Sequence, residues 1–308
     1  MLLSRFADDF LITWIPACAG MTQFCTKWLC NMNGPQLLEQ HVGHLVTSAG
    51  AFFPGERVVF RGQDLHTSLK DLDWLELYLF GITGRRYTPQ QIKVLNAIWS
   101  YTSYPDARIW NNRVAALAGT ARSTGNLGIA AALAVSEAQI YGRGIDLRAS
   151  EFLVRAKISV EAGADLAELV RTEIKQQRSI AGYGRPIVSG DERIAPMMAL
   201  VREHGLDGGP HLKLAFEVEK ILLTGRWRWR MNYGALVAAL GVDLDLSPRE
   251  YYVFMIPAFL AGMPPCYLES VQKPGGLLFP LPCRVMLYQG VARRRWQKVS
   301  PGENHEEM

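Results

Sequence analysis

Two arginines lie on either side of a short loop and have the chemistry of an anion-binding site. Arg185 and Arg193 are eight residues apart, and a helical pattern begins close to the second of them. A guanidinium group presents a planar fork of N–H donors that matches both oxygens of a carboxylate. These two residues therefore predict a site that holds the carboxylate of a small acid. The alternative is that each arginine pairs with a nearby acid, Asp191 or Glu192.

A glycine-rich tripeptide comes directly before this loop. It consists of Gly182, Tyr183 and Gly184. Glycine adopts backbone conformations closed to other residues and allows a ligand to approach the main chain closely. We interpret the tripeptide as a ligand-contacting loop, and the alternative is an ordinary tight turn.

A third cationic segment alternates arginine with tryptophan over Arg226–Arg230. Such a run can stack on bases and bind phosphates, as single-stranded nucleic-acid sites do. No other segment has the pattern of a nucleic-acid-binding module. We therefore expect an exposed loop at the entry of a helix, and no nucleic-acid partner.

Composition describes an ordinary globular protein of 308 residues with a net charge of +4. Apolar residues make up 49% and charged residues 20%, which excludes an intrinsically disordered chain. The five cysteines and six histidines lack the spacing of a metal site, so we expect no metal. No apolar run reaches the ~18–20 residues needed to cross a bilayer, so we expect no membrane association. The odd number of cysteines favours a reducing cytoplasm.

The first 31 residues differ in character from the rest. Their apolar stretch, Phe10–Met21, is preceded by Asp8 and Asp9, whereas a signal peptide begins with basic residues. We expect residues 1–31 to be an over-long or disordered extension, with Met32 as the initiator.

Helical periodicity dominates from residue 34 onward and predicts an all-α fold. One exception is a β-type run near 57–61 that ends in a glycine turn. Thr88 followed by Pro89 is a typical helix start. The expected helices cover 69–80, 88–101, 111–121, 127–141, 150–176, 192–204, 211–223, 233–241, 248–262 and 264–272.

Four stretches, read in order over roughly 56–292, resemble citrate synthase. Each has the glycine or aromatic pattern of a segment of that family, and they are Val58–Leu65, Arg113–Gly119 with Gln139–Gly142, Gly182–Pro186 with Asp191–Arg193, and Met231–Ala235 with Ala239–Gly241. The resemblance implies a citrate synthase-like two-domain helical fold and a homodimer. The large domain would comprise 32–144 and 242–308, and the small domain 145–241, with ligands in the cleft between them.

The resemblance also implies which residues occupy the site. Tyr141, Arg185 and Arg230 stand where the family carries two catalytic histidines and an aspartate. Arg193 keeps the place of an arginine that holds the acid ligand. The Gly182–Gly184 loop would present backbone groups to the adenine of coenzyme A.

These substitutions limit the chemistry. A guanidinium has a pKa above about 12 and cannot remove a proton from an acyl-CoA. Tyr141 is the candidate base, because neighbouring arginines would lower its pKa. A carboxylate such as Glu137 or Asp243 is another possible replacement.

Two functions remain open. The first is an acyltransferase or citryl-CoA lyase of tricarboxylic acid metabolism, which makes or breaks a C–C bond between an acyl-CoA and a small keto or hydroxy acid. Its coenzyme A thioester would be a substrate, with no permanently bound cofactor. The second is a catalytically inactive homologue that binds coenzyme A or a carboxylate as a sensor or partner subunit.

Overall fold

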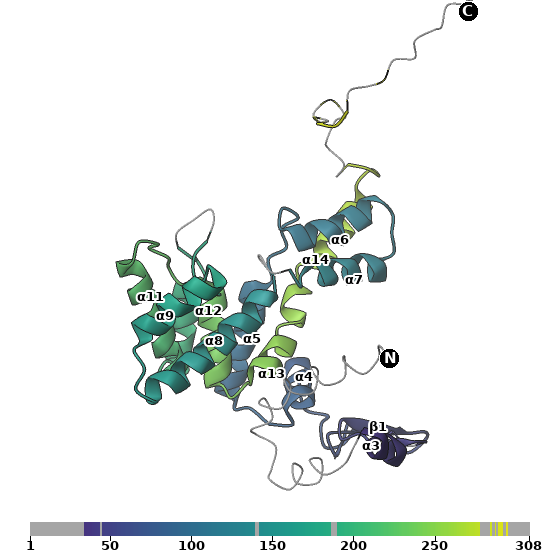
Figure 1. Ribbon diagram of the computed structural model, residues 1–308. Coiled ribbons are helices and arrows are strands. Elements are labelled where there is room, and N and C mark those ends of the chain that lie inside the picture. Colours follow the sequence, from purple (N-terminus) through teal and green to yellow (C-terminus); the bar gives the residue numbers. More distant parts are fainter. Residues whose placement is uncertain are drawn as a thin grey trace, which may run out of the picture. The chain divides into compact units, whose positions relative to one another are not determined.

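The computed structural model describes residues 34–43, 45–138, 142–185, 190–277, 284, 287, 289–291 and 294 (Figure 1). Tyr141 and the extension 1–31 lie outside the described residues. The chain divides into two compact units, Met1–Asp71 and Leu72–Met308.

The first unit contains one helix and a small antiparallel sheet. Helix α3 covers Gly34–His41, and strands β1 (Gly50–Phe53), β2 (Arg57–Phe60) and β3 (Gln63–Asp64) pair in that order. The predicted β-type run near 57–61 is confirmed as β2. The turn into β3 uses Arg61 and Gly62, both with positive φ (49° and 78°). The sequence pattern did not predict β1, whose four residues GAFF do not alternate polar with apolar, or β3, which has only two residues.

The second unit is helical, which confirms the all-α class. Its elements are α4 (Trp74–Thr83), α5 (Pro89–Thr102), α6 (Trp110–Thr120), α7 (Gly125–Val135), α8 (Gly144–Glu161), α9 (Leu166–Gln177), α10 (Ile194–Glu203), α11 (Pro210–Thr224), α12 (Tyr233–Asp243), α13 (Pro248–Phe254), the 3-10 turn η2 (Pro257–Phe259) and α14 (Met263–Gln272). The division of this unit into a large and a small domain stays a prediction.

Several predicted boundaries were wrong for local reasons. The expected helix 150–176 is two helices, because Gly163 has φ +93° and Asp165 caps a new start. The expected helix 127–141 ends at Val135. The expected helix 248–262 breaks after Phe254 and continues as the short 3-10 turn at Pro257.

Helix starts follow the side-chain signals in the sequence. Thr88 accepts a hydrogen bond from the Gln91 amide and Gln91 returns one, which confirms the predicted cap. Asp73 and Ser247 begin α4 and α13 with the same reciprocal arrangement. Such a cap satisfies amides that would otherwise lack partners, and it typically stabilises a helix by about 1 kcal/mol.

Helix α12 is the centre of the core. Its residues from Ala235 to Gly241 are all buried, and it packs against α8 and α11 (Figure 1). Gly241 is required here, because a Cβ would lie 2.5 Å from the ring of Tyr251. This packing fixes the start of α12, which carries part of the candidate site.

Helices α6, α7 and α14 form a second packed group through small residues (Figure 1). A Cβ on Gly119 would lie 2.5 Å from the carbonyl oxygen of Tyr267, and one on Gly128 would lie 2.7 Å from the Cβ of Ala118. Close approach of the backbones explains the alanine and glycine content of this region.

One segment, Pro248–Gln272, has the length and composition of a membrane-spanning helix. In the structure this segment contains α13, the 3-10 turn and α14, and its Tyr251 and Phe254 are fully buried in the core. Core packing therefore accounts for its apolar character.

Candidate functional site

The glycine tripeptide lies against the start of α12. The Gly184 amide donates to the Arg230 carbonyl at 2.7 Å, and the Asn232 amide donates to the Gly182 carbonyl at 2.9 Å. The Asn232 side chain donates to the Gly184 carbonyl at 2.9 Å and also caps α12. The structure therefore brings the Gly182–Arg185 segment and the Arg226–Arg230 segment together through their backbones.

Packing determines the residue types of this loop. Gly182 has φ +87°, and a Cβ on it would lie 2.5 Å from the Cβ of Ala235 and 2.6 Å from its amide nitrogen. Gly184 has φ +84°. Tyr183 is buried, and its hydroxyl donates to the Ala215 carbonyl at 2.8 Å. The tyrosine ring is thus part of the core. Any ligand contact of this loop must use its backbone, whose Gly184 amide and Gly182 and Gly184 carbonyls also bond to the start of α12.

Arg193 is held by the fully buried carboxylate of Asp191. Its Nε donates to Asp191 Oδ1 at 2.9 Å and its Nη2 donates to Oδ2 at 2.8 Å. The Tyr233 amide, the first of α12, also donates to Asp191 Oδ2 at 2.9 Å. Burial raises the pKa of Asp191, but these hydrogen bonds outweigh it and hold the pKa at about 2.

Aromatic rings surround the Arg193 guanidinium. Its Cζ lies 4.5 Å from the ring centroid of Tyr233 and 5.4 Å from that of Tyr104. The side chain is mostly buried, and its Nη1 makes no hydrogen bond with the residues that the structure describes. One donor of this fixed cation thus remains for a ligand.

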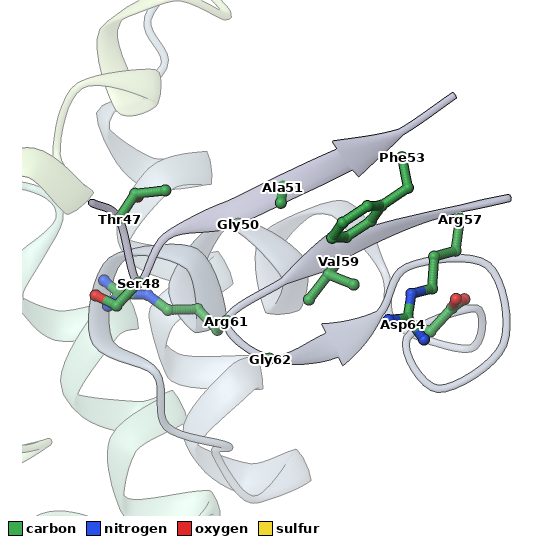
Figure 2. A pocket seen from close by; sticks show the side chains of 10 residues that line it. All are labelled: Thr47, Ser48, Gly50, Ala51, Phe53, Arg57, Val59, Arg61, Gly62 and Asp64. Atoms are coloured by element: carbon green, nitrogen blue, oxygen red, sulfur yellow. The ribbon is translucent and has the colours of Figure 1, made fainter. Parts of the chain in front are cut away.

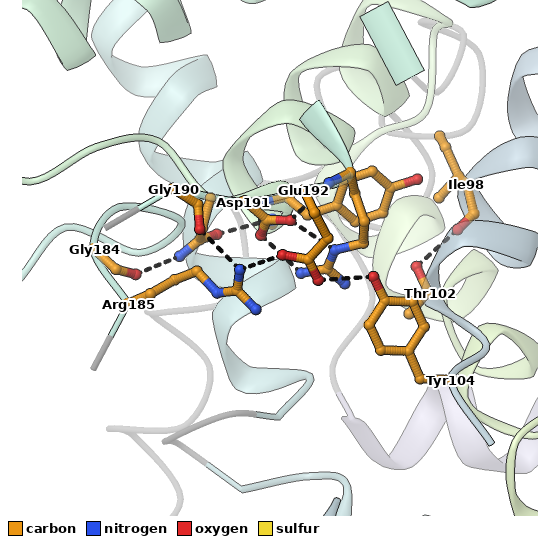
Figure 3. Close-up of polar contacts among 12 residues, drawn as sticks. Ile98, Thr102, Tyr104, Gly184, Arg185, Gly190, Asp191 and Glu192 are labelled. Carbon is orange, nitrogen blue, oxygen red and sulfur yellow. Dashed lines mark hydrogen bonds and ion pairs between the residues drawn. The ribbon is translucent and has the colours of Figure 1, made fainter. Parts of the chain in front are cut away.

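Arg185 belongs to a more exposed network (Figure 3). Its Nη1 lies 2.6 Å from Glu192 Oε2 and donates to the Gly190 carbonyl at 2.9 Å. The Tyr104 hydroxyl donates to Glu192 Oε1 at 2.9 Å. Both arginines therefore pair with the local acids, as the alternative interpretation of the sequence required. Ligand binding by either of them stays a prediction.

Arg230 is exposed and ends a loop that is ordered by its own aromatic side chains. Trp227 and Trp229 stack with ring centroids 5.1 Å apart, and the Arg226 guanidinium lies 4.2 Å from the Trp227 ring centroid. The expected exposed loop is confirmed. Tyr141, the candidate base, lies outside the described residues.

The two carboxylates named as replacement bases already have partners. Asp243 accepts hydrogen bonds from the His211 ring at 2.8 Å and from the Leu212 amide at 2.8 Å, at the start of α11. Glu137 lies 2.6 Å from the Arg143 Nη1 and accepts from the Tyr252 hydroxyl at 2.6 Å. Both therefore stabilise the fold.

One further carboxyl group was missed by the sequence patterns. Asp146 is buried in the first turn of α8, and its Oδ2 has no hydrogen-bond partner in the part of the chain that the structure describes. A single aspartate at a helix start is too common to attract attention, so only its burial reveals it.

The pockets lie elsewhere. A pocket of about 700 Å³ in the first unit is lined by residues of the sheet and its connections, including Thr47, Arg57 and Asp64 (Figure 2). A smaller one, of about 220 Å³, lies between α4 and α5 beside Arg85 and Tyr87. Neither is lined by a predicted site residue. Across the described part of the chain, no group of three histidine, cysteine or acidic side chains could hold a metal ion.

Sequence comparisons give no relative. No family model matches the chain. No curated protein matches it either.

Solved structures share the fold. Citryl-CoA lyase from Hydrogenobacter thermophilus superposes with a TM-score of 0.72 at 18% identity, over 82% of this chain and 97% of that one. ATP citrate lyase from Methanothrix soehngenii, in complex with citrate and coenzyme A, gives 0.67 at 15% identity, over 85% of this chain and 45% of that one. Citrate synthase from Thermoplasma acidophilum gives 0.57 at 16% identity, over 74% and 59%.

The chain therefore has the fold of the citrate synthase superfamily, as its sequence predicted. The identities of 15–18% make it a divergent example of that fold.

Proposed function

We propose that this protein binds a coenzyme A thioester and makes or cleaves a C–C bond between its acyl group and a small keto or hydroxy acid. The solved structures that share its fold include a citryl-CoA lyase and an ATP citrate lyase bound to citrate and coenzyme A. A citrate synthase with the same fold was solved with carboxymethyl coenzyme A and oxaloacetate. The fold supports this class of ligands, and the site must supply the chemistry.

The proposal depends on one observation: Arg193 and the Gly182–Gly184 loop are both held at the start of α12, and we call this place the junction. Asp191 fixes both the guanidinium and the start of α12, and Asn232 connects that start to Gly184. Nη1 of Arg193 then holds a carboxylate of the acid substrate. The Gly182–Gly184 backbone lies next to it and contacts the nucleotide end of the thioester.

Charge favours anionic ligands at this junction. Arg193 keeps a full positive charge, and its pKa is raised because its pairing with Asp191 outweighs the effect of burial. Arg185 and the exposed Arg230 are joined to the same loop. Cationic groups that converge on a partly desolvated site increase affinity for acids and phosphates.

The reaction needs a base at the α-carbon of the acyl group. Neither Arg185 nor Arg230 can accept that proton, because a guanidinium does not deprotonate at neutral pH. Tyr141 is the candidate from the sequence. If no group takes this role, the protein binds the same ligands without turnover, which is our second candidate function. The arginines at two catalytic positions favour it.

Arg193→Lys tests the site. The control is Arg202→Met, at an exposed position in the last turn of α10, the helix that begins directly after Arg193. The lysine keeps the charge but loses the fork of donors. We expect citrate and keto acids to bind at least ~10-fold more weakly to Arg193→Lys, about 1.4 kcal/mol, and the control to behave as wild type.

Turnover separates the two candidate functions. Thiol release from acetyl-CoA with a panel of keto acids, and cleavage of citryl-CoA, would establish the enzyme. Binding without turnover would establish the sensor or partner subunit. Failure of wild type to bind either ligand class at millimolar levels would contradict both.

We also propose that the protein is a homodimer. Leu127 of α7 (66% exposed) and Leu268 of α14 (56% exposed) are exposed apolar side chains on two helices that pack against each other. We place the dimer contact on these two helices, because contiguous exposed apolar patches mark contact surfaces. Leu127→Glu should convert the dimer to a monomer in analytical ultracentrifugation, and a wild-type monomer would refute the proposal.

A further inference from the structure

A buried cluster of polar groups lies where α8 begins. Asp146 is in the first turn of this helix, and its carboxyl group is fully buried. Arg143 and Tyr251 are also buried. Within the described ranges, the Asp146 Oδ2, the Arg143 Nε and the Tyr251 hydroxyl have no hydrogen-bond partner. Buried polar atoms without hydrogen bonds are uncommon in folded proteins, and each requires an explanation.

The cationic member of the cluster is held in place. Arg143 Nη1 lies 2.6 Å from Glu137 Oε1, and its Nη2 donates to the Tyr252 carbonyl at 2.7 Å. Its Cζ lies 4.2 Å from the Tyr252 ring centroid. Since this guanidinium already neutralises Glu137, it compensates only part of a charge on Asp146.

The cluster adjoins the candidate site. A Cβ on Gly234, in the first turn of α12, would lie 3.6 Å from the Ile145 side chain and 3.7 Å from the Gly182 Cα. The residue before Asp146 thus packs at the junction of α12 with the glycine loop. The positive charge of Arg193 lowers the pKa of Asp146. The two groups therefore lie near each other at this junction.

We propose that Asp146 is the general base that removes a proton from the α-carbon of the bound acyl-CoA. The inference rests on the proposed function. It follows by comparison with other acids of this region, because Asp191 pairs with Arg193 and Glu137 pairs with Arg143. Asp146 has an oxygen that accepts no hydrogen bond from the residues that the structure describes, and a base needs such an oxygen.

The proposed reaction can run as condensation or as cleavage. The α-carbon–hydrogen bond breaks, its electron pair remains in the enolate, and the proton moves to Asp146 Oδ2. The enolate carbon then bonds to the ketone carbon of the acid, the ketone oxygen takes a proton from solvent to become a hydroxyl, and Asp146 releases its proton to solvent. In cleavage, the hydroxyl loses its proton to solvent, the C–C bond breaks, and Asp146, protonated from solvent, gives its proton to the enolate carbon.

The electrostatics suit a group that both accepts and returns a proton. Burial raises the pKa of Asp146 to about 7, Arg143 and Arg193 oppose that rise, and Glu137 adds to it. A base with a pKa near the working pH exists in both protonation states, which makes it most effective. Tyr251 faces the group from α13, and burial keeps its hydroxyl protonated by raising its pKa.

The test is exchange of α-protons, which needs no completed reaction. Acetyl-CoA is incubated with the full-length protein and citrate in D2O, and deuterium in the acetyl group is measured by mass spectrometry. The variant is Asp146→Asn, which keeps the shape of the side chain. Asp243→Asn is the matched control, because Asp243 is an equally buried carboxylate that caps α11. Tyr141→Phe tests the rival base.

We expect Asp146→Asn to exchange at least ~100-fold more slowly, with unchanged coenzyme A affinity and circular dichroism. The control Asp243→Asn should stay within about threefold of wild type per folded molecule. Tyr141→Phe decides between the two candidate bases, because a larger loss there than in Asp146→Asn would assign the role to Tyr141. The wild-type rate should rise with pH up to about 7, where the carboxyl ionises, and the variant should lack this rise.

Other results would overturn the assignment. Exchange that survives in Asp146→Asn, or is lost only in Tyr141→Phe, excludes Asp146 as the base. Coenzyme A binding without any exchange in wild type also excludes it, while leaving the binding part of the proposed function intact. Absence of coenzyme A binding in wild type instead refutes the proposed function itself.

Discussion

Removal of Asp191 tests whether one carboxylate organises the candidate site. Asp191→Ala deletes both hydrogen bonds to the Arg193 side chain and the acceptor of the Tyr233 amide. Arg193 is then left mostly buried beside two aromatic rings without an anion. The change should destabilise the second unit and release the first turn of α12.

The magnitude follows from the pKa of Asp191. A folded-state pKa of about 2 against an ordinary value of 3.8 corresponds to about 2 kcal/mol of stabilisation by the ionised carboxylate. Breaking a buried ion pair by removing one partner costs about 3–5 kcal/mol, because the other charge is left unpaired. We therefore expect a loss of about 3 kcal/mol at pH 7.

Urea unfolding at two pH values measures this effect. Because the pKa of Asp191 is depressed, its contribution is complete above pH 4 and disappears as the pH falls towards 2. Wild type and Asp191→Ala should thus differ by about 3 kcal/mol at pH 7, or roughly 6–12 °C in thermal midpoint, and should converge near pH 2.

Two controls make the result specific. Arg193→Met in the Asp191→Ala background should recover part of the lost stability, because it removes the unpaired cation. Asp165→Ala removes an exposed cap at the start of α9 and should cost only about 1 kcal/mol. A loss below about 1 kcal/mol in Asp191→Ala, or no recovery in the double variant, would refute the reasoning.

Three further predictions concern single positions. Gly182→Ala should cost more than about 2 kcal/mol by chemical denaturation, because the new Cβ meets Ala235 at 2.5 Å and the φ is positive; a neutral effect would show that the loop is not packed on α12. Asp146→Asn should stabilise the protein increasingly from pH 4 to pH 7, by up to about 4 kcal/mol, because ionisation of the raised-pKa carboxyl opposes folding; a pH-independent difference would contradict that pKa. Arg122→Ala should lower the free energy of unfolding by about 1–3 kcal/mol, because the guanidinium donates to the carbonyls of Ser270 and Lys273 at the end of α14. An unchanged urea midpoint would show that these hydrogen bonds do not stabilise the protein.

Much of the fold could be predicted from the sequence because its signals are local. The cap at Thr88 and the apolar periodicity define α5 without help from the rest of the chain. The helical pattern does not predict the break at Gly163, because apolar residues continue on both sides of it. The local signals of that break are Gly163 itself and the capping residue Asp165. Strands β1 and β3 owe their existence to pairing with β2, which no single stretch reveals.

The candidate site was predictable only in part, because it depends on partners that are distant in sequence. The arginine pair and the glycine loop were found from residue types, but a sequence does not show that Asp191 also caps α12. Burial of Asp146 likewise results from packing between α8, α12 and α13. The homodimer and the cytoplasmic location stay predictions.

Calorimetric titration of coenzyme A into the full-length protein, with and without saturating citrate, tests the central claim most directly. We predict saturable binding at one site per chain, and tighter binding when citrate occupies Arg193. The absence of any binding heat for coenzyme A and for citrate, from a protein with a cooperative unfolding transition, would contradict it.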